Sequence, residues 1–142
     1  METEDNPKAG NHRVILSLAS NYEQKNHLSE ARRRLGQVMC SLSFTDELWS
    51  EPYAVKQKFS VNQELPKPLY LNQLAQGVTG LSVDELTLWL KQTEIDMGRT
   101  ADARAKGIVG IDLDLMLYDS VRYHERDWTR PYITPLLSQI EG

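Results

Sequence analysis

The spacing of hydrophobic residues along the chain changes repeatedly, and each change marks the boundary of a predicted element. Apolar residues two positions apart indicate a strand, and apolar residues three or four apart indicate one face of a helix. This spacing predicts a strand, a helix, two strands, a second helix and a further strand, at residues 12–19, 23–35, 38–50, 70–79, 82–97 and 110–118. The order is that of a ferredoxin-like split β-α-β fold of the α+β class. We therefore expect an antiparallel sheet with both helices on one face, which leaves the other face for ligands or for the C-terminal tail.

Short polar signals mark the ends of the two predicted helices. Ser82 and Glu85 have the spacing of a capping box at the start of the second helix, and Gly98 follows its end. Ser20 and Asn21 form a turn and cap signal before the first helix.

Three segments are less regular. Residues 38–50 predict one extended segment, residues 53–69 a loop or a short added hairpin, and residues 99–107 a polar loop. In the first of these segments the residues expected to point inward are Leu42, Phe44 and Leu48.

The composition indicates one soluble globular domain. The chain has 142 residues, of which 40% are hydrophobic and 25% are charged, and its net charge of -4 gives no basic field for nucleic acid or a membrane surface. The single cysteine, Cys40, fits a reducing cytosol, and no apolar run approaches membrane-spanning length. We expect a disordered lead-in at residues 1–10, one domain at 11–142, a cytoplasmic location and a monomer, with no nucleic-acid or membrane partner.

Acidic residues alternate with large aliphatic residues between Gly110 and Tyr118. On a strand this places Asp112 and Asp114 on one face, with the intervening aliphatic residues directed into a core. Two adjacent carboxylates repel each other unless a cation lies between them, and Mg²⁺ commonly takes one or two carboxylates together with substrate phosphates. The pattern therefore predicts a magnesium-phosphate site, and its alternative is a strand with one solvated acidic face.

Four short stretches carry a resemblance to a known family. They are Ala-Ser-Asn at 19–21, Tyr-Leu-Asn at 70–72, Glu94 with the later Gly-Arg at 98–99, and Ile-Asp-Leu-Asp-Leu-Met-Leu at 111–117. In this order, over about residues 14–136, they resemble the 6-hydroxymethyl-7,8-dihydropterin pyrophosphokinases of folate biosynthesis. The resemblance implies that residues 11–142 form a single pyrophosphokinase-like domain.

The resemblance implies transfer of the two terminal phosphates of ATP to the hydroxymethyl group of the pterin. It implies that Asp112 and Asp114 hold two Mg²⁺ ions that bridge the triphosphate, with Arg99 also catalytic. Tyr70 would stack on the pterin ring and Asn72 would bind its edge, with Tyr132 as a further substrate contact. The residues implied to bind ATP are Glu94, Arg99, Arg104, Thr129 and Arg130.

Several positions depart from the family pattern. Val109 and Ala101 stand where the family places arginines, and Lys106 stands where it places a tryptophan, although Arg104 lies near enough in sequence to substitute for one arginine. Loss of guanidinium groups weakens charge compensation around a polyphosphate.

The tail is shorter than that of the family and aligns in two ways. Without gaps, Thr129 and Pro131 match a family Thr and Pro, and Tyr132 replaces a phosphate-contacting histidine. With a deletion, Arg130 and Tyr132 match an Arg-x-Phe whose aromatic ring forms the second wall of the pterin site.

Three functions fit the sequence: a pyrophosphokinase, a degenerate relative that binds pterin or nucleotide without efficient catalysis or uses another acceptor, and a ferredoxin-like interaction or RNA-binding module. The last lacks the basic and aromatic strand pattern of RNA-reading sheets. Of the remaining residues, we single out His124, in the tail near the expected ATP site, and Trp128, as a cover for an adenine.

Overall fold

The computed structural model describes residues 10–51 and 68–140, and it has the expected α+β architecture. Along the chain the elements are β1 (His12–Ser20), α1 (Gln24–Leu35), β2 (Cys40–Phe44), β3 (Leu48–Ser50), β4 (Tyr70–Thr79), α2 (Val83–Asp96), α3 (Ala101–Ala105), β5 (Asp112–Tyr118), β6 (Val121–Arg122), the 3₁₀ helix η1 (Glu125–Thr129) and α4 (Thr134–Leu137). The expectation for residues 1–10 and most of that for residues 53–69 lie outside the described residues.

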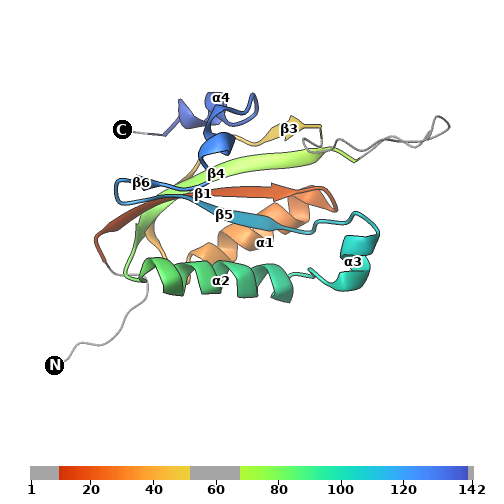
Figure 1. The fold of residues 1–142 in the computed structure, drawn as a ribbon, viewed down its shortest axis with the longest axis horizontal. Helices are drawn as coiled ribbons and strands as arrows, with labels where there is room; N and C mark the ends of the chain where they lie inside the picture. Colours follow the sequence, from red (N-terminus) through yellow and green to blue (C-terminus); the bar gives the residue numbers. More distant parts are fainter. Residues whose placement is uncertain (1–9, 52–67, 141–142) are drawn as a thin grey trace.

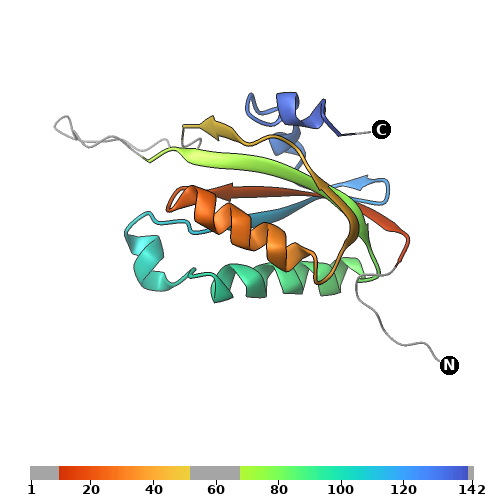
Figure 2. The same ribbon diagram turned by 180° about the vertical axis from the view of Figure 1, so that it is seen from behind.

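The strands form one antiparallel sheet in the order β2-β4-β1-β5-β6, and β3 also pairs with β4. Figure 1 and Figure 2 show α1 and α2 on one face of this sheet and the C-terminal η1 and α4 on the other. The fold class expected from the sequence is therefore confirmed, and the tail occupies part of the second face.

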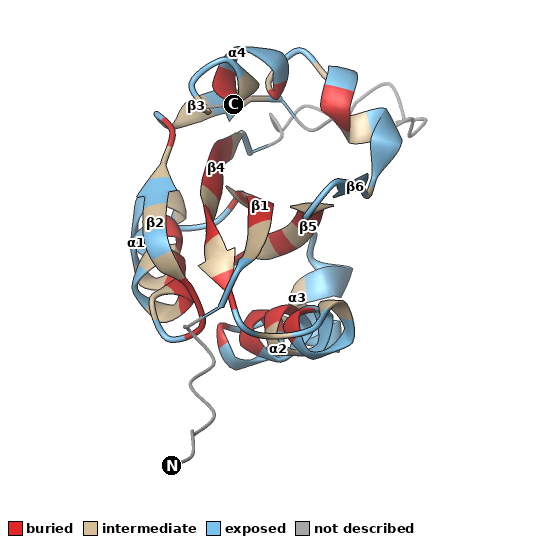
Figure 3. Ribbon diagram, turned by 90° about the vertical axis from the view of Figure 1, so that its left-hand side faces the viewer, coloured by how far each residue is buried: buried red, intermediate tan, exposed pale blue. Residues whose placement is uncertain are grey.

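Two apolar clusters hold the layers together. The first lies between the sheet and the two long helices, where the inner faces of α1 and α2 are buried against β1, β4 and β5 (Figure 3). The second lies between the sheet and the tail, and its buried members are Ile15, Leu74, Met116, Trp128, Ile133 and Leu136. Because both faces are covered, the central strands β1 and β4 carry buried residues on both sides.

The segment 38–50 is two strands rather than one. Thr45 interrupts it, because its backbone N–H donates to the Leu74 carbonyl while its hydroxyl accepts from the Leu74 N–H, at 3.0 Å in each case. After this interruption Leu48 packs against the second cluster, whereas Leu42 and Phe44 pack against the first. All three side chains thus point inward as expected, but they pack on opposite faces of the sheet.

Two local expectations also change. The polar stretch 99–107 contains the short helix α3, whose first turn is capped by the hydroxyl of Thr100, which accepts from Ala103 N–H at 3.0 Å. Asn21 does not cap α1, because the N-cap residue is Glu23 in a left-handed conformation without a side-chain cap. By contrast, the capping box of Ser82 and Glu85 is present as expected.

Within the described residues, no helix combines the length and the apolar character that crossing a membrane requires.

Candidate active site

The paired carboxylates lie on β5 as the sequence predicts. Burial alternates along the strand, because Leu113 and Leu115 are buried in the first cluster while Asp112 and Asp114 are half-buried. Met116, next on the same face as the two aspartates, belongs to the second cluster. The pair therefore shares the face that carries the tail, away from α1 and α2.

Burial and charge act together on Asp114. Burial, and next the negative charge of Asp112, raise the pKa of the Asp114 carboxyl to about 6, although nearby His124 acts in the opposite direction. The His124 imidazole Nε2 lies 4.0 Å from Asp114 Oδ1. Two partly buried carboxylates that disfavour each other's ionised form are the condition under which such a pair attracts a divalent ion.

Arg99 connects the carboxylate pair to the end of α2. Its Nη2 donates to Asp112 Oδ1 at 3.2 Å, and its Nε lies 3.6 Å from Glu94 Oε1. Glu94 is only 2% exposed, and its Oε2 accepts the backbone N–H of Leu113 at 2.7 Å. Burial is the main cause that raises the pKa of Glu94. Glu94 thus lies behind the strand rather than on the open face with the aspartates.

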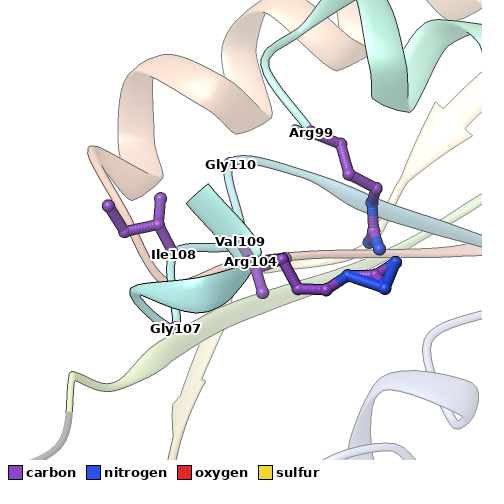
Figure 4. Close-up of a pocket in the computed structure, with 6 residues that line it drawn as sticks. All are labelled: Arg99, Arg104, Gly107, Ile108, Val109 and Gly110. Atoms are coloured by element: carbon purple, nitrogen blue, oxygen red, sulfur yellow. The ribbon is translucent and has the colours of Figure 1, made fainter. Parts of the chain in front are cut away.

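A pocket that includes Arg99 lies beside the segment that precedes β5. It has a volume of about 60 Å³ and is lined by Arg99, Arg104 and residues 107–110. Figure 4 shows the two arginine side chains converging on the same region. Val109, where an arginine was expected by resemblance, lines the same pocket with an apolar side chain.

Asn21 holds this segment in place. Its Nδ2 donates to the Gly107 carbonyl at 2.9 Å, its Oδ1 accepts from Val109 N–H at 2.7 Å, and its backbone N–H donates to the Val109 carbonyl at 2.9 Å. Gly110 then packs so tightly that a Cβ there would lie 3.2 Å from His27 Nε2. Periodicity gives no signal for this role, because Asn21 and Val109 are far apart in the chain, and the role was not predicted from the sequence.

The proposed pterin contacts lie at the start of β4. Tyr70 is half-buried, and burial, followed by the charge of Asp112, raises the pKa of its phenol. The neighbouring Asn72 is buried, and its Nδ2 donates to the Leu48 carbonyl and to Ser50 Oγ, at 2.9 and 2.8 Å. Both Asn72 and Asp112 pair with Ala19 of β1, on its two sides. The register therefore brings the Tyr70 end of β4 close to the carboxylates.

The candidate residues of the tail are placed less uniformly. Thr129 is exposed and donates to the Arg126 carbonyl at 3.4 Å, Arg130 Nε donates to Asp127 Oδ1 at 2.7 Å, and Tyr132 packs against the second cluster.

Trp128 does not have the role considered for it. It is 9% exposed, it belongs to the second cluster, and its Nε1 donates to the Tyr123 carbonyl at 3.0 Å. The guanidinium of Arg122 lies 4.1 Å from its ring centroid. The expectation that this ring is open to cover an adenine is therefore wrong, because the sheet and Arg122 already cover it.

The described residues contain no group of three or more His, Cys, Asp and Glu side chains arranged to hold a metal ion. The two carboxylates nevertheless fit magnesium, which completes its coordination with substrate phosphates and water rather than with protein ligands alone. Asp112 and Asp114 are therefore the residues present that would hold the ion.

Comparison with known proteins matches residues 15–142 to the family model described as 7,8-dihydro-6-hydroxymethylpterin-pyrophosphokinase. The chain is similar to a folate synthesis bifunctional protein of Arabidopsis thaliana, with 30% identity over 91% of this chain and 27% of that protein. It is also similar to two proteins named folate synthesis bifunctional protein, mitochondrial: one from Arabidopsis thaliana, with 30% identity over 92% of this chain and 24% of that protein, and one from Pisum sativum, with 36% identity over 54% and 16%. The chain thus spans about a quarter or less of the length of these relatives.

Proposed function

Because the chain belongs to the 7,8-dihydro-6-hydroxymethylpterin-pyrophosphokinase family, we propose that it transfers a pyrophosphoryl group from ATP to the hydroxymethyl group of 6-hydroxymethyl-7,8-dihydropterin. In this reaction the pterin hydroxyl oxygen forms a bond to the β-phosphorus of ATP. The bond from that phosphorus to the oxygen bridging the α- and β-phosphates breaks, AMP leaves, and the hydroxyl proton is released. By this proposal, the chain acts in folate synthesis, the process in the names of its relatives.

The observation that carries the proposal is the position of Asp112 and Asp114, half-buried on one face of β5 beside Arg99. These carboxylates would hold two Mg²⁺ ions against the triphosphate. Bound there, magnesium supplies neutralisation of charge on the transferred group and alignment of the attacking and leaving oxygens.

The remaining residues bind and orient the two substrates. Arg99 and Arg104, which line one pocket, would contact the phosphates of ATP. Tyr70 would stack on the pterin ring and Asn72 would contact the edge of the ring. Of the tail residues, Thr129 and Arg130 would contact ATP and Tyr132 would contact the pterin.

The product nucleotide tests the proposal. Incubation of the protein with ATP, magnesium and the pterin should release AMP rather than ADP, as followed by anion-exchange separation of the nucleotides. If no AMP forms while a control pyrophosphokinase is active under the same conditions, the proposed reaction is rejected.

A second candidate is a relative that binds the substrates without efficient catalysis. It is favoured by Val109 and Ala101 at positions of family arginines, and by the contacts of Arg99 to Glu94 and Asp112. This protein would bind a non-hydrolysable ATP analogue in calorimetric titration but release no AMP. If neither substrate binds, this candidate fails as well.

We further propose a cytoplasmic monomer, which rests on the single Cys40 and on the size of the domain. The names of two plant relatives place those proteins in mitochondria.

A further inference from the structure

Glu94 is a buried carboxylate on the inner face of α2. It continues the apolar stripe of Leu86 and Leu90 at the same four-residue spacing, and it is 2% exposed. A carboxylate that is removed from water to this extent is costly unless hydrogen bonds satisfy its oxygens. The hydrogen-bonding partners of Glu94 therefore indicate the role of its side chain.

One oxygen of Glu94 replaces a missing strand neighbour. Among the strands that the structure describes, β6 pairs with β5 only at Leu117 and Tyr118, so the outer edge of β5 is open at the aspartates. Leu113, the residue between Asp112 and Asp114, donates its backbone N–H across this edge to Glu94 Oε2 at 2.7 Å. The bond thus joins α2 to the middle of the carboxylate pair.

The other oxygen of Glu94 faces Arg99. The separation of Glu94 Oε1 and Arg99 Nε is 3.6 Å, and Arg99 Nη2 lies 3.2 Å from Asp112 Oδ1. A closed path of contacts therefore runs from the backbone of Leu113 through Glu94 and Arg99 to the side chain of Asp112. Such a path fixes both the strand and the orientation of one of its carboxylates.

We propose that Glu94 is a positioning residue, which sets the spacing of Asp112 and Asp114 through the Leu113 amide and does not itself contact the nucleotide. This inference rests on the proposed function only for its effect on turnover. It differs from the role in ATP binding implied by resemblance, because both oxygens of Glu94 face groups of the protein behind the strand.

Two conservative substitutions separate the two roles. Glu94→Gln removes the charge but keeps an acceptor oxygen at the same reach, whereas Glu94→Asp keeps the charge but is one methylene too short to reach Leu113. A positioning role predicts that Gln preserves the function better than Asp. A direct electrostatic role toward nucleotide or metal predicts the reverse order.

The first readout is the hydrogen exchange rate of the Leu113 amide in ¹⁵N-labelled protein without substrates. We expect exchange within about threefold of wild type in Glu94→Gln and at least about tenfold faster in Glu94→Asp. Asp96→Asn and Asp96→Glu are matched controls, because Asp96 lies on the same helix with its side chain exposed, and both should leave Leu113 unchanged.

The second readout is the split between kcat and KM. Glu94→Asp should lower kcat by about 100-fold while the KM for the pterin changes by less than about threefold, and Glu94→Gln should keep kcat within about tenfold of wild type. Higher activity in Glu94→Asp than in Glu94→Gln, or an unchanged Leu113 amide in Glu94→Asp, overturns the proposal. The exchange measurement needs no turnover. A failure of the proposed Glu94–Leu113 contact can therefore be distinguished from a failure of the proposed reaction.

Discussion

At the scale of single residues, the clearest consequence of the structure concerns the protonation of Asp114. Its pKa of about 6 exceeds the ordinary value of the unfolded chain, near 4, because the carboxyl is buried beside Asp112. Between these two values the folded protein holds a proton that the unfolded chain has lost. The free energy of unfolding should therefore fall as the pH rises from about 4 to about 6.

Asp114→Asn should remove this dependence, because an amide does not ionise. Above about pH 6 the variant should be more stable than wild type by about 1–3 kcal/mol, as measured by urea unfolding across the range. Asp46 is exposed and lies between β2 and β3. Asp46→Asn should therefore keep the wild-type dependence of the free energy of unfolding on pH. The same dependence in Asp114→Asn would mean that this carboxyl is not perturbed by folding.

Tyr70 is expected to act on the pterin rather than on ATP. Removal of the ring by Tyr70→Ala should raise the KM for the pterin by about tenfold or more, since stacking of a flat heteroaromatic ring contributes about 1–3 kcal/mol. The KM for ATP should change by much less. Tyr22→Ala, which removes the ring of a residue that is 46% exposed, should leave both KM values near wild type. An equal rise for both substrates in Tyr70→Ala would contradict the assignment.

At the scale of elements, the site depends on how the segment 107–110 is attached to the turn between β1 and α1. Two side-chain hydrogen bonds of Asn21 to Gly107 and Val109 make this attachment. Their loss leaves a carbonyl and an amide that are partly shielded from water without partners.

Asn21→Ala should therefore lower the free energy of unfolding by about 1–3 kcal/mol and accelerate exchange of the Val109 amide. Chemical denaturation and amide exchange by NMR measure these effects. Asn26→Ala, at an exposed position of α1, is the matched control and should behave as wild type. If the Val109 amide of Asn21→Ala exchanges at the wild-type rate, the attachment lies elsewhere.

The elements that the sequence predicts well are those whose signal is local. The alternation through Leu113 and Leu115 places the two aspartates on one face, and the Ser82 capping box places the start of α2, because both patterns lie within a few residues. The spacing of Glu94 from Leu86 and Leu90 also indicates locally that its side chain is buried on α2. The resemblance instead implies that Glu94 binds ATP.

Features that depend on distant partners were not predicted. The break at Thr45 comes from hydrogen bonds to Leu74 on another strand, and the role of Asn21 comes from backbone groups near Val109. The seven-residue strand β5 also ends beside Asp119, which has a positive φ of 57°, and no hydrophobic pattern specifies such a turn. Pairing across long sequence separations is not encoded in periodicity.

At the scale of the whole molecule, the tail is a second layer rather than a loose end. Trp128, Ile133 and Leu136 are buried against Ile15, Leu74 and Met116 of the sheet. This layer lies on the face that carries the aspartates, so its attachment bears on both stability and access to the site.

Trp128→Ala should therefore destabilise the protein by about 3–5 kcal/mol, which is the usual cost of removing a large buried aromatic side chain. Trp49→Ala, at a ring that is 47% exposed, should cost less than about 1 kcal/mol. Thermal unfolding followed by circular dichroism gives the comparison. Similar small effects of both substitutions would show that the tail does not pack as described.

The most direct test of the account is a ³¹P NMR time course with ATP, magnesium and 6-hydroxymethyl-7,8-dihydropterin. The account predicts that the ATP signals are replaced by the single resonance of AMP and by the two coupled resonances of a pterin diphosphate ester. It also predicts that Asp112→Asn and Asp114→Asn abolish this conversion, whereas Asp46→Asn does not. Formation of ADP with a pterin monophosphate, or full activity in either site variant, would contradict it.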